Sequence, residues 1–248
     1  MTIDLTGRAM DRSGLIDTTF DFRSDTPPGK DADALSPTLH RYHRLLWSKP
    51  LPGGFLFELT DRRPRGYLYH RSELGEFRLS SDTVIPTFRK ERKLAHVFEN
   101  SPEELAEFMR IGYTIGAMMI FPGNQVNRRM TINAARGCHP LIKDRFDLTV
   151  ECVRRHYAGD ESPLSPVLVR YADFFRLFGD FRGYVEFFLL QDLVAEHGEV
   201  RYFAPFDGFG SSPVPDGLDA YRDYRDHAVR FIEARNRRIA TWWSARPF

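Results

Sequence analysis

The chain has 248 residues, 42% of them hydrophobic and 28% charged, and its formal net charge is +1. This composition is typical of a globular protein and excludes a disordered chain or a membrane protein. The small net charge excludes a strong overall field that would steer the molecule onto nucleic acid or acidic lipid. Two cysteines, Cys138 and Cys152, are too few for a secreted disulfide framework, and residues 1–20 contain no apolar leader. We therefore expect a cytoplasmic protein.

Strand signals dominate the first hundred residues. Residues 15–22 are rich in β-favouring types and predict a strand. A helix is expected over residues 37–48, because Ser36 can cap it and Pro37 suits its first turn. Residues 54–86 contain short apolar runs separated by polar turns, which is typical of an antiparallel meander.

Helical patterns dominate after residue 100. Pro102 begins one helix, and residues 113–121 then predict a buried strand. The closing helix collects arginines near its end, where cations stabilise the negative pole of the helix dipole. The other expected elements of this half are helices over residues 144–157, 163–178, 181–194 and 219–243, and a strand over residues 201–203.

These elements predict an α+β fold, in which a small antiparallel sheet from the N-terminal half packs against a mainly helical C-terminal half. We expect a single domain over residues 1–248, because no linker, repeat or low-complexity tract interrupts the chain. A subdivision near residue 100 is the alternative that the pattern leaves open. It would separate a strand-rich part, residues 15–100, from a helix-rich part, residues 101–248.

Four short runs together resemble a bacterial family of unknown function, over about residues 20–238. The resemblance implies a bacterial cytoplasmic protein and brings no activity, cofactor or catalytic residue with it. The chemistry must therefore be argued from the residues themselves. The four runs are residues 25–31 (DTPPGKD), 46–52 (LWSKPLP), 131–137 (TINAARG) and 144–149 (DRFDLT).

The most polar and most mixed segment lies between Arg128 and His156. If residues 144–157 are helical, two carboxylates and two guanidinium groups share one face of that helix. One interpretation is a solvated ladder of ion pairs, each contributing about 0.3 kcal/mol. The other is a set of guanidinium forks for phosphate, with a carboxylate that orients them or acts as a base. The residues on this face are Asp147, Glu151, Arg154 and Arg155.

Our preferred hypothesis is an enzyme or sensor that binds a phosphate-bearing ligand, such as a nucleotide or a nucleic-acid end. The candidate acid-base residues are Asp147, Glu151 and His139. The eight histidines show no metal-binding spacing, so no metal site is expected, and the sequence leaves the cofactor unknown. The candidate ligand-binding residues are Asn133, Arg136, Arg154 and Arg155.

The alternative hypothesis is a noncatalytic interaction protein. In this case the C-terminal helix docks a protein partner through an exposed pair of tryptophans, Trp242 and Trp243, because tryptophan dominates interface hot spots. The charged segment would then be structural ion pairing. The two hypotheses differ in whether Arg136, Arg154 and Glu151 converge on one concave pocket.

Overall fold

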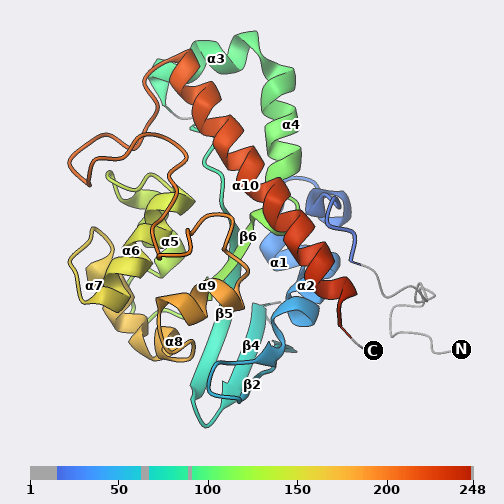
Figure 1. The fold of residues 1–248 in the computed structure, drawn as a ribbon. Coiled ribbons are helices and arrows are strands. Elements are labelled where there is room, and N and C mark those ends of the chain that lie inside the picture. Colours follow the sequence, from blue (N-terminus) through green and yellow to red (C-terminus); the bar gives the residue numbers. More distant parts are fainter. Residues whose placement is uncertain (1–15, 63–66, 89–90, 247–248) are drawn as a thin grey trace, which may run out of the picture.

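A four-stranded antiparallel sheet lies at the centre of the computed structural model, which describes residues 16–62, 67–88 and 91–246 (Figure 1). A separate pair of short strands, β1 (Lys49–Pro50) and β2 (Leu56–Phe57), precedes it along the chain. The meander expected over residues 54–86 is confirmed, and its last strand pairs with a strand from beyond residue 100. The order of the central sheet is β3 (Thr60–Arg62), β4 (Tyr67–Ser72), β5 (Gly75–Thr83) and β6 (Met118–Pro122).

The two inner strands explain why the sheet lies in the middle of the molecule. In β5, Phe77, Leu79 and Ser81 are buried and the residues between them are more exposed, which is the alternation of a strand with one covered face. Every residue of β6 is buried, so helices cover it on both faces. The register pairs Asp82 of β5 with Met119 of β6, which brings a carboxylate to the edge of the core.

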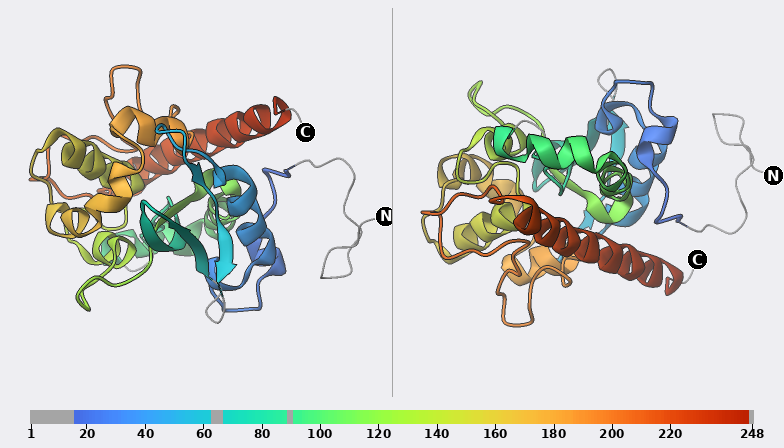
Figure 2. Two further views of the ribbon diagram at one scale, coloured as in Figure 1. Left: turned by 90° about the horizontal axis from the view of Figure 1, so that it is seen from below. Right: turned by 90° about the horizontal axis from the view of Figure 1, so that it is seen from above.

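Helices enclose the sheet on both sides. Helices α5 to α9 gather on one side and α1 and α2 on the other, while the long α10, drawn in red, runs past α4 along the molecule (Figures 1 and 2). Within the described residues, no helix combines the length and the apolar character needed to cross a bilayer. The helices are α1 (Ala32–Leu35), α2 (Pro37–Trp47), α3 (Ala95–Asn100), α4 (Pro102–Gly112), α5 (Ile132–Cys138), α6 (Phe146–Ala158), α7 (Ser165–Leu168), α8 (Ala172–Arg176), α9 (Phe181–Phe187) and α10 (Leu218–Ser244).

The predicted α+β class is confirmed, and so are the best-signalled helices. Ser36 caps α2 as expected, because its hydroxyl accepts the amide hydrogen of Leu39 at 3.0 Å. Helix α10 covers the whole of the closing helix predicted over residues 219–243. The helix expected over residues 163–178 is instead broken into α7, a 3₁₀ turn over Val169–Tyr171 and α8.

Two strand predictions are wrong, because side chains take the backbone donors that a strand would use. Residues 16–21 form no strand, and a 3₁₀ turn follows, since Asp21 accepts the amide hydrogen of Arg23 at 3.0 Å. Leu15, where this prediction begins, lies outside the described residues. Residues 201–203 form no strand either, since the amide of Phe203 donates to the carboxylate of Asp147 at 2.9 Å.

Arg235 of α10 joins the two ends of the fold from inside the core. Its side chain is fully buried and donates to the carbonyls of Phe188 (2.9 and 3.2 Å), Gly116 (3.0 Å) and Met118 (2.8 Å). It therefore ties α10 to the start of β6 and to the end of α9. The expected role at the pole of the helix dipole is wrong for this arginine, because α10 continues to Ser244.

The buried face of α10 that contains Arg235 also explains the exposure of the two tryptophans. Trp243 follows the buried residues Arg235 and Ile239 at intervals of four, so it faces the core and is only 8% exposed. Trp242 is half-buried and stacks on Lys49 and Arg246. The expectation of an exposed pair is therefore wrong for Trp243.

Replacing Arg235 by methionine tests whether its hydrogen bonds hold α10 against β6 and α9. We expect Arg235→Met to lower the free energy of unfolding by about 4 kcal/mol, because three buried carbonyls lose their donors. Urea unfolding followed by circular dichroism measures the change. Arg237→Met, at an exposed position of the same helix, is the matched control and should change stability by less than about 0.5 kcal/mol. A decrease in the free energy of unfolding of less than about 1 kcal/mol for Arg235→Met would contradict this role of Arg235.

Candidate functional site

A cleft of about 260 Å³ opens where the start of α1 meets the ends of β5 and α4. We call it the aspartate cleft, because its wall contains three aspartates and no lysine, arginine or histidine. The other polar groups of the wall are hydroxyls and one amide. The wall consists of Asp31, Ala32, Asp33, Ser80, Ser81, Asp82, Thr83, Tyr113, Met118 and Asn133.

The first turn of α1 presents Asp33 to the sheet. Asp31 caps this short helix and accepts the amide hydrogen of Asp33 at 3.0 Å. One oxygen of Asp33, Oδ1, then accepts both the amide and the hydroxyl of Ser81, each at 2.6 Å. Upstream, Asp25 accepts the hydroxyl of Ser36 at 2.6 Å, which holds the preceding turn against α2. These bonds fix Asp33 at the cleft although α1 is only one turn long.

Burial decides the protonation of Asp33. It raises the pKa of this carboxyl to about 7, against the opposing effect of the two hydrogen bonds from Ser81. The negative charges of Asp31 and Asp82 make a smaller contribution to this increase. Near neutral pH, Asp33 therefore exchanges between its acid and its carboxylate form, as a group that moves protons requires.

Asp82 faces the same cleft but has a cationic partner. Burial raises its pKa to about 6, Arg136 lowers it, and the charge of Asp144 raises it. The guanidinium Nη1 of Arg136 donates to Oδ2 of Asp82 at 2.8 Å. Asp82 is consequently ionised over a pH range in which Asp33 still holds a proton.

Arg136 is held in place by the loop between α5 and α6. Its side chain is fully buried and donates from Nη2 to the carbonyl of Asp144 at 2.7 Å and from Nε to the hydroxyl of Thr149 at 3.1 Å. Nη1 also forms an ion pair with the Asp144 carboxylate at 2.8 Å. Lys143 and Asp144 both have left-handed backbone conformations, φ 48° and 65°, which are unfavourable without such contacts.

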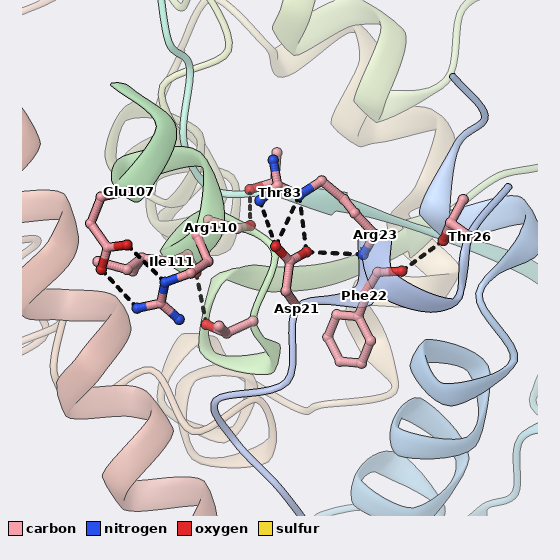
Figure 3. A network of polar contacts seen from close by, with 10 residues as sticks. Asp21, Phe22, Arg23, Thr26, Thr83, Glu107, Arg110 and Ile111 are labelled. Carbon is pink, nitrogen blue, oxygen red and sulfur yellow. Dashed lines mark hydrogen bonds and ion pairs between the residues drawn. The ribbon is translucent and has the colours of Figure 1, made fainter. Parts of the chain in front are cut away.

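Asn133 and Thr83 complete the polar wall. The amide of Asn133 donates to Ser80 Oγ at 3.2 Å, and its buried oxygen has no hydrogen-bond partner among the described residues. Thr83 donates to the carbonyl of Gly112 at 2.7 Å and so joins β5 to the end of α4. Figure 3 shows Thr83 together with the Arg23–Asp21 and Arg110–Glu107 ion pairs.

The structure separates the residues that the sequence suggested. Asn133 and Arg136 lie at the aspartate cleft. Asp147 is fully buried elsewhere, where it pairs with Arg145 and accepts the amide of Phe203. His139 lies at the end of α5, where its Nδ1 accepts the amide hydrogen of Leu141 at 3.2 Å. It lines neither the aspartate cleft nor the second cleft, which is described next.

Glu151, Arg154 and Arg155 form one cluster on α6. Both arginines donate to the buried Glu151 carboxylate at 2.8 Å. Burial raises the pKa of Glu151, but these hydrogen bonds outweigh it and hold the pKa below the usual range. Arg154 also lines a second cleft of about 830 Å³, which we call the arginine cleft. Arg136, which binds Asp82 of the aspartate cleft, and Arg154 therefore lie at two different clefts.

The arginine cleft lies between α6, α9 and the chain that follows α9. Arg154, Arg182 and Arg201 come to its wall from three different segments, together with His197. Arg182 is paired with Glu186 at 2.8 Å, whereas Arg201 has no acidic partner within the described residues. Acidic groups also line this cleft, so its charge is mixed: Asp180, Glu186 and Glu196.

Sequence reasoning missed the central carboxylates, Asp33 and Asp82. Neither belongs to a motif with a known spacing, and 48 residues separate Asp33 from its partner Ser81. A signal was nevertheless present. Three of the four runs on which the family resemblance rests meet here, through Asp31, through Asn133 and Arg136, and through Asp144.

The fold and the cleft define a class of protein: an α+β protein with two interacting, half-buried carboxylates in a small polar cleft. The chain belongs to a family described as a family of unknown function (DUF6994), whose model matches residues 16–239. No curated protein and no solved structure matches the chain. In the part of the chain that is described, no group of three or more histidine, cysteine or acidic side chains is placed to hold a metal ion.

The raised pKa of Asp33 makes stability depend on pH in a defined direction. Because the folded state binds this proton more tightly than the unfolded state, the Asp33 contribution to stability is full at about pH 4 and declines as pH rises through about 7. Asp33→Asn cannot lose a proton. We expect its free energy of unfolding, relative to the wild type, to increase by at least about 1 kcal/mol between about pH 4 and about pH 8.

Urea unfolding at several pH values measures this difference. Asp223→Asn, at an exposed position of α10, is the control and should follow the wild type at every pH. A constant difference between Asp33→Asn and the wild type would mean that Asp33 titrates as an ordinary surface aspartate.

Proposed function

We propose that the protein is an enzyme that uses general acid–base catalysis on a small hydroxyl-bearing substrate in the aspartate cleft. The observation that carries the proposal is the pair of interacting, half-buried carboxyls in one cleft, with pKa values of about 7 for Asp33 and about 6 for Asp82. Two carboxyls that differ in environment can divide the roles of acid and base between them.

The wall of the cleft supports a neutral or cationic substrate. Three aspartates without a basic residue in the wall disfavour a phosphate group there, because like charges repel strongly at a partly buried site. Hydroxyl groups of a sugar would satisfy the carboxylate oxygens and the unpartnered oxygen of Asn133. A volume of about 260 Å³ suits a ligand of about the size of one sugar ring.

The reaction class that this arrangement supports is hydrolysis of a glycosidic bond. Asp33, in its acid form, donates a proton to the oxygen that leaves the sugar. Asp82, held as a carboxylate by Arg136, either stabilises the positive charge that develops on the sugar or activates the attacking water. The products are the free sugar and the alcohol, and one water is consumed.

A panel of p-nitrophenyl glycosides tests this function. We expect a bell-shaped rate profile between about pH 6, where Asp82 becomes ionised, and about pH 7, where Asp33 loses its proton. Asp33→Asn should lower kcat about 100-fold or more, because asparagine keeps the shape of the side chain but cannot donate that proton. Asp223→Asn should leave the rate unchanged.

Ligand binding provides a second measurement on the same cleft. In ligand-observed NMR, glucose and glucosamine should bind, and glucose 6-phosphate should bind at least about ten times more weakly. Equal binding of the phosphate, or no binding and no hydrolysis of any sugar, would overturn the proposal.

We propose the arginine cleft as a second candidate site, for a phosphate-bearing ligand such as a nucleotide or a nucleic-acid end. The observation that favours it is Arg201, a guanidinium group without an acidic partner in the described residues, beside Arg154 and His197. A phosphate would bridge Arg201 and Arg154 by charge-assisted hydrogen bonds. Its larger volume, about 830 Å³, also suits a nucleotide.

Titration calorimetry with AMP and pyrophosphate tests this second site. Arg201→Gln should weaken binding about tenfold, because one charge-assisted hydrogen bond is lost. Asp33→Asn, which lies in the other cleft, should bind as the wild type does. An unchanged affinity in Arg201→Gln would exclude a role of this arginine in phosphate binding.

We also propose that the protein works in the bacterial cytoplasm. Both cysteines are free thiols, Cys138 exposed and Cys152 buried, which supports a reducing compartment.

A further inference from the structure

Lys49 lies in an aromatic box far from both carboxylates of the aspartate cleft. Its Nζ is 4.6 Å from the ring centre of Trp242, 4.7 Å from that of Phe187 and 5.2 Å from that of Trp47. The three rings come from α10, α9 and α2, which meet near the C-terminal end of α10 (Figure 1). The residue itself is only 7% exposed.

The Lys49 amine has no carboxylate within ion-pair distance among the described residues. The charged groups that act on it are the guanidinium groups of Arg246 and Arg235, which carry the same sign of charge. Burial, which is the largest cause, and the two arginines together lower the pKa of Lys49 to about 7. Cation–π contacts compensate only part of the cost of a buried ammonium. Near neutral pH, a large share of the amine is therefore uncharged and nucleophilic.

Lys49 also forms part of the wall of a pocket of about 480 Å³. The apolar residues of the wall include Pro50, Leu51 and Phe187, and the ring of Phe187 lies against the amine. Its charged residues are Asp180, Arg182 and Glu186, and the last two pair with each other at 2.8 Å.

We propose that Lys49 is a covalent binding site for a small aldehyde or ketone with an apolar body, which it holds as an imine. The amine nitrogen bonds to the carbonyl carbon, and the carbonyl oxygen leaves as water with the two amine protons. No oxidant or reductant is consumed. A buried amine that has no ion-pair partner among the described residues and lines a pocket is the arrangement that such chemistry needs.

Trapping with benzaldehyde and sodium cyanoborohydride tests the proposal on the unmodified protein. The reagent reduces an imine to a stable benzyl-lysine, which peptide mass mapping locates. At about pH 7.5, we expect Lys49 to be labelled at least about ten times faster than Lys30 or Lys93, which are exposed. The Lys49 rate should level off above about pH 7, whereas the rates at the exposed lysines should keep rising.

Two further outcomes decide between a site and mere reactivity. Labelling of Lys49 should saturate with benzaldehyde concentration, because the aldehyde first occupies the pocket; a linear dependence overturns the proposal. Equal labelling of Lys49 and Lys30 overturns it as well. Lys49→Arg, which keeps the positive charge, should abolish the saturable labelling while circular dichroism shows an unchanged fold.

Discussion

The buried guanidinium of Arg136 is the contact on which the aspartate cleft depends. It is the cation that holds Asp82 of β5 and Asp144 of the loop before α6 at one point, and it also reaches Thr149 inside α6. Without it, two carboxylates would lie close together with no positive charge between them. A strand, a helix and a loop are thereby fixed relative to one another by a single side chain.

Among the described residues, Arg136 is one of three fully buried arginines that connect distant segments. Arg145 pairs with Asp147 and donates to the carbonyls of Pro213 and Ala204, which holds the long segment before α10 against α6. Arg235 does the same for α9 and β6, and none of the described carboxylates pairs with it. An arginine suits this task because its five donors lie in one rigid plane and can satisfy several loop carbonyls at once. In each of these cases, one buried guanidinium group therefore connects segments that are distant in the sequence.

Because these arginines join distant segments, they help to explain which parts of the structure could be predicted from the sequence and which could not. Local signals predicted α2, α10 and the meander correctly, because a cap, a periodic stripe or an alternation resides in a few adjacent residues. The charged helix α6 was also predicted, but the direction of its side chains was not. Asp147 points into the core and Glu151 binds two arginines, and no periodicity distinguishes these cases.

The aspartate cleft itself could not be predicted for a related reason. Asp33 and Ser81 meet across 48 residues, and Arg136 meets Asp82 across 54. Each residue is ordinary in its own segment, and only the pairing of α1 with β5 and of α5 with β6 brings them together. Shared runs in the family did point to the right places, because the same residues that build the cleft also build the turns around it.

A net charge of +1 conceals a strong local division of charge. One cleft has three aspartates in its wall and no basic residue, another combines three arginines with three acidic residues, and a lysine lies apart in an aromatic box. Desolvation gives each of the buried groups its chemical character: it favours the proton on Asp33 and disfavours the proton on Lys49. The same physical cost therefore produces an acid in one place and a nucleophile in another. The two sites differ in the charge of the surrounding residues: aspartates act on Asp33, and arginines act on Lys49.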